Sequence, residues 1–148
     1  MRTRFKTDTA TLIVVDPACV RHRINDDADW WSVPAEELGE VNRGNALFVN
    51  LGSDGTYDLD ITGEAPPAGA QFADVLIRNE GGLFFVGAGE HMTSEGMEPE
   101  AAHGNVYVDC PPGTYRVVVW MIGTTLSVRL TPSKGPAVNA LPATPRVA

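Results

Sequence analysis

The sequence predicts an all-β fold: an antiparallel β-sandwich, jelly-roll-like, of about eight short strands with one short helix. Short runs rich in Val, Ile, Tyr, Thr and Trp recur along the chain, and Gly, Pro, Asn and Asp separate them. A good helix start occurs only once. Strands and turns that alternate this often are typical of a closed or double-layered antiparallel sheet.

The first predicted strand is the apolar run at residues 11–15, which an Asp-Pro turn closes. The helix is predicted to begin at Ser32, because serine is a good N-cap and Pro34 suits the first turn. Acidic residues follow near the positive end of the helix dipole. Gly39 and Gly44 limit this helix to about two turns.

Two hairpins are predicted in the middle of the chain. Residues 46–51 and 56–61 flank a Gly-Ser-Asp-Gly loop, whose residues accept unusual backbone dihedrals. Apolar and polar residues alternate in 56–61, so one face of that strand should meet water. Residues 72–78 and 83–86 flank an Asn-Glu-Gly-Gly sequence and form the second predicted hairpin.

The strongest strand signal lies in the C-terminal half. Residues 106–108 and 114–122 flank a Pro-Pro-Gly turn, in which the prolines pre-set φ and the glycine relieves the turn. Both alternating sets of side chains in residues 115–122 are largely apolar, which predicts a central strand covered on both faces. Residues 125–130 form the last predicted strand.

The chain has 148 residues and 43% apolar content, enough for one core of ordinary size. We therefore expect a single β-sandwich domain over residues 1–131. Residues 132–148 carry four prolines and show no periodicity. This Pro-rich tail should be extended or disordered.

No apolar run approaches the length of a membrane span, and the first residues lack the hydrophobic core of a signal peptide. We therefore expect a soluble, cytoplasmic protein. The two cysteines, Cys19 and Cys110, do not form the disulfide framework of a small secreted domain, and we expect reduced, partly buried thiols. His22 lies near Cys19 in sequence, but a catalytic Cys–His pair is set in space and needs a third group.

The charge is uneven along the chain. The sequence has 19 acidic and 11 basic residues, a net charge of −8. Five basic residues lie near the ends, so residues 7–131 contain six basic and all 19 acidic residues, a net charge of −13. Such a surface repels nucleic acid and attracts basic proteins, although the charge alone also serves solubility.

Residues 26–31 place three carboxylates beside two indoles. Tryptophan is enriched at the centres of protein interfaces, so this segment is the first candidate for contacts with a partner. Alternatively, one indole packs against the core while the other covers an edge. A calcium loop would need further spaced ligands and a glycine that are missing. The predicted contacts are Asp26, Asp27, Asp29, Trp30 and Trp31.

Residues 87–104 form the longest segment without a convincing strand, and long loops on a rigid sheet often carry function. His91 and His103 are ligand types that bind zinc or iron inside jelly rolls. The His-x-His spacing of such sites is missing, which favours a mobile acidic connector. Glu95 and Glu98 in this segment form the second predicted group of partner contacts.

Motifs of hydrolases and nucleotide-binding enzymes are missing from the sequence. It contains no Gly-x-Ser-x-Gly elbow, no phosphate-binding Gly-rich loop with a lysine, and no His-Glu-x-x-His. We therefore expect no catalytic residues, no metal site and no cofactor.

The strand-turn-strand at residues 106–120 resembles the late part of small bacterial immunity-type proteins, a group that includes the inhibitor of the competence DNA-entry nuclease. The resemblance extends over about residues 10–131. It implies a β-sandwich that binds and blocks a toxic enzyme without catalysing a reaction. Further segments look like an uncharacterised bacterial family found near toxin genes: Asp29-Trp30-Trp31, Glu36-Glu37-Leu38, Gly44-Asn45 and residues 51–57.

These observations favour a non-enzymatic protein-binding module, an immunity protein or inhibitor that neutralises a basic toxin such as a nuclease. A small-ligand or carbohydrate-binding module, with Trp30 and Trp31 as a stacking platform, is the alternative. A metal-dependent enzyme built on His91 and His103 is a third hypothesis. The sequence predicts no nucleic-acid or membrane partner and leaves the oligomeric state open.

Overall fold

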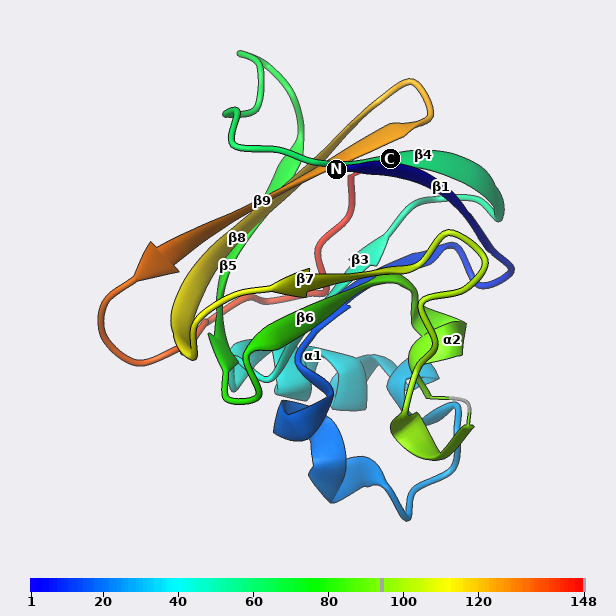
Figure 1. The fold of residues 1–148 in the computed structure, drawn as a ribbon, viewed down its shortest axis with the longest axis vertical. Helices are drawn as coiled ribbons and strands as arrows, with labels where there is room; N and C mark the ends of the chain where they lie inside the picture. Colours follow the sequence, from blue (N-terminus) through cyan, green and yellow to red (C-terminus); the bar gives the residue numbers. More distant parts are fainter. Residues whose placement is uncertain (94, 148) are drawn as a thin grey trace.

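The computed structural model describes residues 1–93 and 95–147, which form nine strands and a few short helices (Figure 1). The strands are β1 (Arg2–Thr7), β2 (Thr11–Val15), β3 (Ala46–Asn50), β4 (Gly55–Ile61), β5 (Phe72–Asn79), β6 (Leu83–Ala88), β7 (Val106–Asp109), β8 (Gly113–Ile122) and β9 (Thr125–Ser133). The α-helices are α1 (Pro34–Asn42) and α2 (Gly89–Met92), and the 3₁₀ segments are η1 (Pro17–Arg23), η2 (Trp30–Ser32) and η3 (Glu95–Met97).

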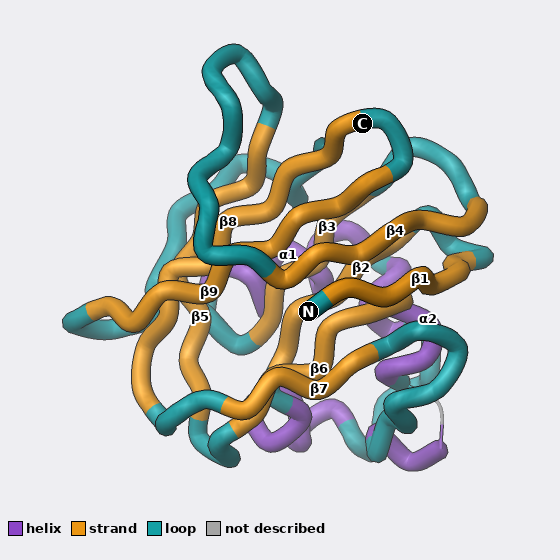
Figure 2. The backbone as a smooth tube through the Cα atoms, turned by 45° about the horizontal axis from the view of Figure 1, so that its top comes forward, coloured by secondary structure: helices purple, strands orange, loops and turns teal. Residues whose placement is uncertain are grey.

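The strands form two sheets that face each other (Figure 2). One sheet has five strands in the order β1-β4-β9-β8-β5, and the other has four in the order β3-β2-β6-β7. All strand pairs are antiparallel except β4 with β9, which is parallel. The predicted all-β sandwich is confirmed, with nine strands rather than about eight.

The core lies between the sheets and continues beneath α1. Every residue of β2 is buried, because its two faces are covered by different parts of the molecule. Phe48, Phe84 and Phe85 are completely buried in the same apolar cluster, which takes in residues of both sheets. Apolar burial on this scale is the main term that holds such a sandwich together.

The two predicted hairpins and the predicted Pro-Pro-Gly turn instead carry the chain from one sheet to the other. β3 and β4 lie in different sheets, and so do β5 and β6, and β7 and β8. The tight turn between β8 and β9, by contrast, joins neighbouring strands of one sheet. A short Gly-rich turn serves a hairpin or a corner between sheets equally well, so the local sequence does not distinguish them.

Strand β1 was not predicted, because its alternating basic residues resemble a solvated terminus. In the structure Arg2 and Arg4 lie on the outer face of the five-stranded sheet, opposite Asp60 and Asp58 of β4. Phe5 points the other way and is buried. β8 has neighbours on both sides, β9 and β5, as its two apolar faces predict.

Helix α1 begins at Pro34, close to the predicted position, but Ser32 does not cap it. The N-cap is Val33, which makes no side-chain hydrogen bond there. The Ser32 hydroxyl donates instead to the carbonyl of Asp29 at 2.7 Å.

No helix in the described part of the chain is long and apolar enough to cross a membrane.

The C-terminal tail, residues 134–147, runs back along α1, β5 and β3 (red in Figure 1). The Asn139 side chain binds both the N–H and the carbonyl of Leu76 on β5, at 2.9 and 2.8 Å. The Asn42 side chain on α1 exchanges two hydrogen bonds with the backbone of Leu141. The tail therefore follows an extended path that covers edges of both sheets.

Candidate functional site

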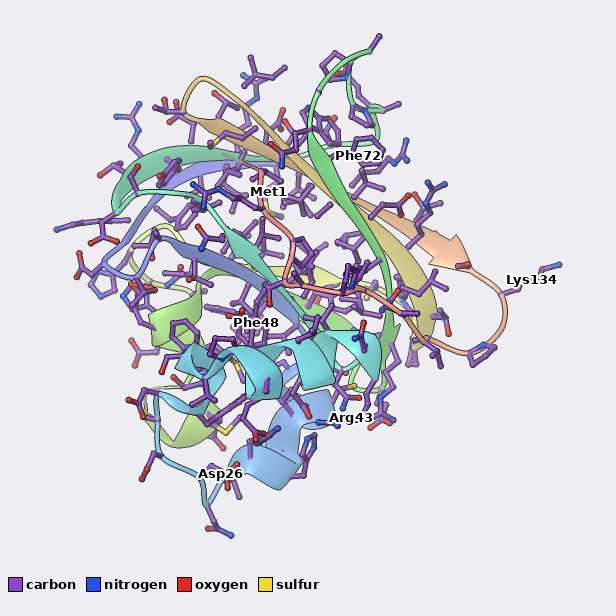
Figure 3. All side chains as sticks on the ribbon, turned by 180° about the vertical axis from the view of Figure 1, so that it is seen from behind. Met1, Asp26, Arg43, Phe48, Phe72 and Lys134 are labelled. Atoms are coloured by element: carbon purple, nitrogen blue, oxygen red, sulfur yellow. The ribbon has the colours of Figure 1, made fainter. Side chains whose placement is uncertain are left out.

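The first predicted group of contacts lies between η1 and α1, at one end of the sandwich. Figure 3 shows Asp26 at the tip of this loop, at the opposite end from Phe72. Asp26, Asp27 and Asp29 are exposed, whereas Trp30 and Trp31 are buried. The structure therefore separates the five residues into an acidic rim and an aromatic base.

Segment η1 and a series of tight turns position this loop. η1 begins at Pro17, where the carboxylate of Asp16 accepts a hydrogen bond from the next free N–H. The N–H of Asp26 then donates to the carbonyl of Arg23 at 2.9 Å, and the N–H of Trp30 to the carbonyl of Asp27 at 3.0 Å. These bonds fix the backbone of the loop that carries the acidic side chains.

Both tryptophans pack on Phe48 of β3. Trp31 stacks on it with ring centroids 5.8 Å apart, and Trp30 meets it edge-on at 5.9 Å. The indole N–H of Trp31 donates to the Thr93 hydroxyl at 3.2 Å. Trp30 is 7% and Trp31 6% exposed, so neither offers an open ring face for stacking on a sugar.

Two hollows share Arg23, Asp26, Asp27 and Trp30 in their walls. The larger, here called the acidic hollow, has a volume of about 500 Å³. The smaller, the inner hollow, has about 190 Å³ and reaches the loop after α2. The acidic hollow is completed by Asn25, Asp29, Ser32, Val33 and Glu36, and the inner hollow by Ile24, Ala28, Thr93, Gly96 and Met97.

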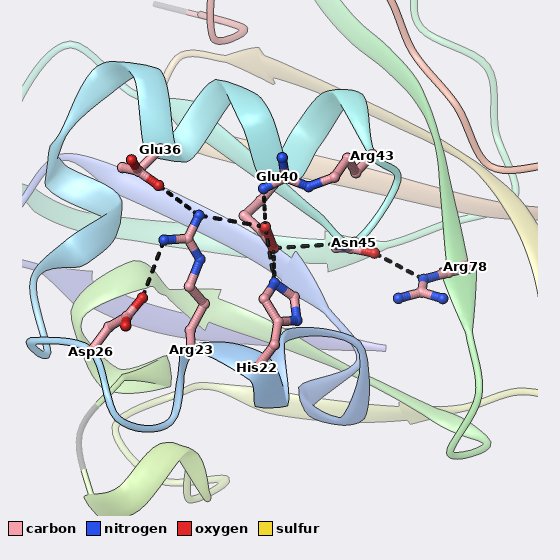
Figure 4. Close-up of polar contacts among 8 residues, drawn as sticks. All are labelled: His22, Arg23, Asp26, Glu36, Glu40, Arg43, Asn45 and Arg78. Carbon is pink, nitrogen blue, oxygen red and sulfur yellow. Dashed lines mark hydrogen bonds and ion pairs between the residues drawn. The ribbon is translucent and has the colours of Figure 1, made fainter.

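Arg23 is the centre of the charged contacts in the acidic hollow (Figure 4). Its guanidinium lies 2.7 Å from Glu36, 3.2 Å from Asp26 and 3.6 Å from Glu40. It also lies over the ring of Trp30, 4.6 Å from the centroid. The positive charge of Arg23 is thus neutralised within the chain. Its ion pairs with Asp26 and Glu36 also link the acidic loop to α1.

Glu40 on α1 is completely buried beneath this surface, and it is not among the residues predicted for the site. Its carboxylate lies 2.9 Å from His22 and 2.5 Å from Arg43, and it accepts a 3.3 Å hydrogen bond from Asn45 (Figure 4). Burial opposes ionisation, but these hydrogen bonds outweigh it and lower the pKa of Glu40 below its usual value. The four-residue spacing from Glu36 was the one available signal.

Two buried donors beside the hollows have no acceptor among the described residues. They are the indole Nε1 of Trp30 and the Nε of Arg23. A buried N–H without a partner is costly, and native proteins rarely leave one. This pair therefore marks a place where an incoming oxygen atom would complete the hydrogen bonding.

The second predicted group lies on the loop after α2. Glu98 is exposed, and the side chain of Glu95 lies outside the described part of the structure. Thr93, Gly96 and Met97 of this loop line the inner hollow together with Asp26 and Asp27. The structure thus brings together two segments that are about 70 positions apart in the sequence.

His91 and His103 are brought close, with ring centroids 5.3 Å apart. The side-chain amide of Asn105 donates to Nδ1 of His91 at 2.8 Å. Within residues 1–93 and 95–147, no group of three His, Cys, Asp or Glu side chains is arranged to hold a metal ion. The geometry does not favour the metal-enzyme hypothesis.

Cys19 is not paired with His22, whose ring contacts Glu40 instead. Cys19 is buried, and its thiol faces the carboxylate of Asp16 at 3.7 Å and the carbonyl of Arg78 at 3.6 Å. Burial, aided by the negative charge of Asp16, raises the pKa of Cys19 to about 12. This environment is the opposite of one that activates a nucleophilic cysteine.

We expect Cys19 to resist alkylation in the folded protein, because near pH 8 only about one thiol in ten thousand would be ionised at that pKa. Iodoacetamide labelling followed by peptide mass spectrometry measures this. Cys110 should react first, since it is only partly buried. Both thiols should react at similar rates in denaturant. Rapid labelling of Cys19 in the native state would contradict the assigned environment.

Comparison with known proteins gives a family without an assigned activity. A family model described as "Family of unknown function (DUF6386)" matches residues 1–142. The chain belongs to DUF6386. No curated protein sequence matches it.

Two solved structures resemble this DUF6386 protein in fold. One is titled "Crocagin biosynthetic gene J"; it has a TM-score of 0.57 and 13% identity, with 90% of this chain and 98% of that chain covered. The other is ComJ from Bacillus subtilis, titled as an inhibitor of the DNA degrading activity of NucA. Its TM-score is 0.44 and its identity 9%, with 90% and 96% covered. The first likeness shows a shared fold and nothing about function. The second is too distant to indicate a shared function, so the immunity-type role stays a prediction.

Proposed function

We propose that this DUF6386 protein is a non-enzymatic protein-binding module, whose acidic hollow and rim bind a basic partner protein. In its more specific form, the proposal is that it neutralises a basic toxin such as a nuclease. The observation that supports it is the lining of the hollow: four carboxylates and one guanidinium, which the protein's own acidic groups already neutralise.

The free charge of the hollow is negative. Asp27 and Asp29 form no ion pair within the described part of the chain, whereas Asp58, Asp60 and Asp74 are each paired with an arginine on the sheet. Unpaired carboxylates at a rim raise the rate of encounter with a cationic partner and weaken the complex as salt increases.

Apolar side chains lie next to these charges. Ile24 is 48% and Val33 51% exposed, and they line the inner and the acidic hollow respectively. Protein interfaces combine apolar contact with a polar rim. The hydrogen-bonded turns of the loop also limit the entropy that would be lost on binding.

The carbohydrate-binding alternative has less support. A stacking platform needs an open aromatic face, and both Trp30 and Trp31 are buried against Phe48. The absence of catalysis is part of the proposal: the thiol of Cys19 is held protonated, and its neighbour in sequence, His22, faces Glu40.

We expect the Asp27→Asn/Asp29→Asn variant to bind a natural basic partner at least about tenfold more weakly than the wild type does. The partner is first captured from lysate of the source cells at low salt and then purified for titration. The wild-type affinity should fall as salt rises from about 50 to about 300 mM. Calorimetry measures both effects.

The matched control is Asp54→Asn/Glu64→Gln, which removes the same charge from exposed residues outside the acidic hollow. Its affinity should stay close to that of the wild type. Equal weakening by both variants would mean that net charge alone matters and that the hollow is not the contact surface. An affinity independent of salt would reject the electrostatic mechanism altogether.

A further inference from the structure

We infer that the acidic hollow is a socket for one arginine side chain of the partner. This inference rests on the proposed function and makes it more specific, because it names the group that enters. The hollow is an open depression of about 500 Å³, a volume that accommodates one long side chain.

Arg23 shows what the lining offers to a guanidinium. It lies over the ring of Trp30 at 4.6 Å and donates to Glu36 and Asp26 on either side. These two carboxylates lie on different elements, Glu36 on α1 and Asp26 in the loop after η1. A planar cation with donors on several edges suits such divergent acceptors.

Asp27 and Asp29 line the same hollow and remain open to a second guanidinium. Neither pairs with a basic side chain in the described residues, and both are exposed. They are available without breaking the contacts of Arg23, so the entering cation adds to the network rather than replacing part of it. A like charge beside Arg23 is tolerable here, because four carboxylates surround the space.

The unpartnered Trp30 Nε1 is an independent observation at the same place. Trp30 lines the hollow and is more than nine-tenths buried, and its N–H has no acceptor among the described residues. An arginine within a peptide brings main-chain carbonyls along with its charge. A carbonyl near the socket would accept from this indole, which a free cation alone does not do.

Lysine is the weaker candidate for the same socket. Its ammonium is a compact, strongly hydrated point charge, whereas a guanidinium is flat, less hydrated and able to span two carboxylates. The carboxylates of the hollow come from α1 and from the loop after η1, and a guanidinium can span two of them.

The indole signal of Trp30 in a ¹H–¹⁵N NMR spectrum tests the inference directly, and a Trp30→Phe variant assigns that signal. The probe is the peptide acetyl-Gly-Arg-Gly-amide, with citrulline and lysine analogues as comparisons. We expect a saturable shift of the Trp30 signal at about millimolar arginine peptide, an affinity at least about threefold weaker for lysine, and no shift with citrulline. Citrulline keeps the shape and the carbonyls but removes the charge.

The Asp27→Asn/Asp29→Asn variant should lose the shift, while the Asp54→Asn/Glu64→Gln variant should keep it. Both spectra also report whether the variants are folded. An unmoved Trp30 signal at about 10 mM peptide, an equal response to citrulline, a lysine peptide that binds as tightly as arginine, or a shift that survives in the first variant would each overturn the socket.

The two proposals fail in different ways. If a basic partner binds with salt dependence and is lost with the Asp27/Asp29 variant, but the arginine peptide has no effect, the socket is wrong and the proposed function stands. If the arginine peptide binds and no basic protein does, the socket stands and the proposed function is wrong.

Discussion

We expect Glu40→Ala to lower the free energy of unfolding by about 3 kcal/mol, which corresponds to a fall in melting temperature of about 10 °C. The carboxylate is completely buried and is held by His22, Arg43 and Asn45. Its removal leaves the nearly buried guanidinium of Arg23 with one acidic neighbour fewer. Urea denaturation followed by tryptophan fluorescence measures the change.

The exposed neighbour Glu36 provides the control, since Glu36→Gln should cost about 1 kcal/mol or less. The Glu36 carboxylate is exposed, so water compensates for most of the lost interaction, and Arg23 keeps Asp26 and Glu40 as partners. If the two variants lost similar amounts of unfolding free energy, burial of Glu40 would not increase its contribution to stability.

The pH dependence of the free energy of unfolding should also report on the Glu40 carboxylate. The pKa of Glu40 in the folded state is below its ordinary value near 4.5, so ionised Glu40 stabilises the fold above that pH. This contribution is lost as the pH falls through the folded-state pKa and Glu40 becomes protonated. The wild type should therefore lose stability more steeply below about pH 4.5 than Glu40→Gln does. Parallel curves would contradict the assigned pKa direction.

We expect Asp16→Ala to lower the free energy of unfolding by about 3 kcal/mol as well, through a different mechanism. The carboxylate of Asp16 is buried and accepts from the N–H groups of Glu80 and Gly81, both at 2.7 Å, and from that of Ala18 at 3.0 Å. One side chain thus caps η1 and fastens the turn between β5 and β6. Thermal and urea unfolding both measure the loss.

Asp16→Asn keeps one acceptor oxygen and should fall between alanine and the wild type. Asp109→Ala, at an exposed position at the end of β7, should change stability by about 0.5 kcal/mol or less. The capping account would be wrong if Asp16→Asn were as damaging as Asp16→Ala, because the shape and remaining acceptor of the side chain would then contribute nothing.

Glu40 and Asp16 also matter for the candidate site. Asp16 caps the start of η1, and η1 places Arg23 next to its acidic partners. The buried carboxylate of Glu40 lies 3.6 Å from the Arg23 guanidinium. Two buried carboxylates therefore help to position the acidic loop: Asp16 at the start of η1, and Glu40 beside His22 and Arg23 at its end.

Much of the fold follows from local sequence. Eight of the strands are visible as runs of β-branched and aromatic residues, and the helix near Pro34 is visible from its proline and its acidic first turn. These signals are readable because strand and helix preferences depend on neighbouring residues. The acidic loop before α1 is visible for a similar reason, since a run of charges beside tryptophans stands out in one short segment.

The tertiary structure alone decided how those strands are joined. The turn at residues 79–82 resembles that of a hairpin, yet it carries the chain between sheets, and the carboxylate of Asp16 fastens it from another element. The parallel pairing of β4 with β9 likewise joins strands that are more than 60 residues apart. Such pairings depend on which buried faces complement one another across the core, and no local pattern records this.

At the candidate site, residue type determined some features and folding determined others. The sequence by itself determined that Asp26, Asp27 and Asp29 form an acidic segment, because charge is a property of residue type. Only the folded chain decided that Trp30 forms a buried wall rather than an exposed platform, and that Arg23 and Glu40 lie behind the acidic loop. Burial and ion pairing depend on which distant segments meet, and here α1 and β3 meet the loop through packing that the core dictates.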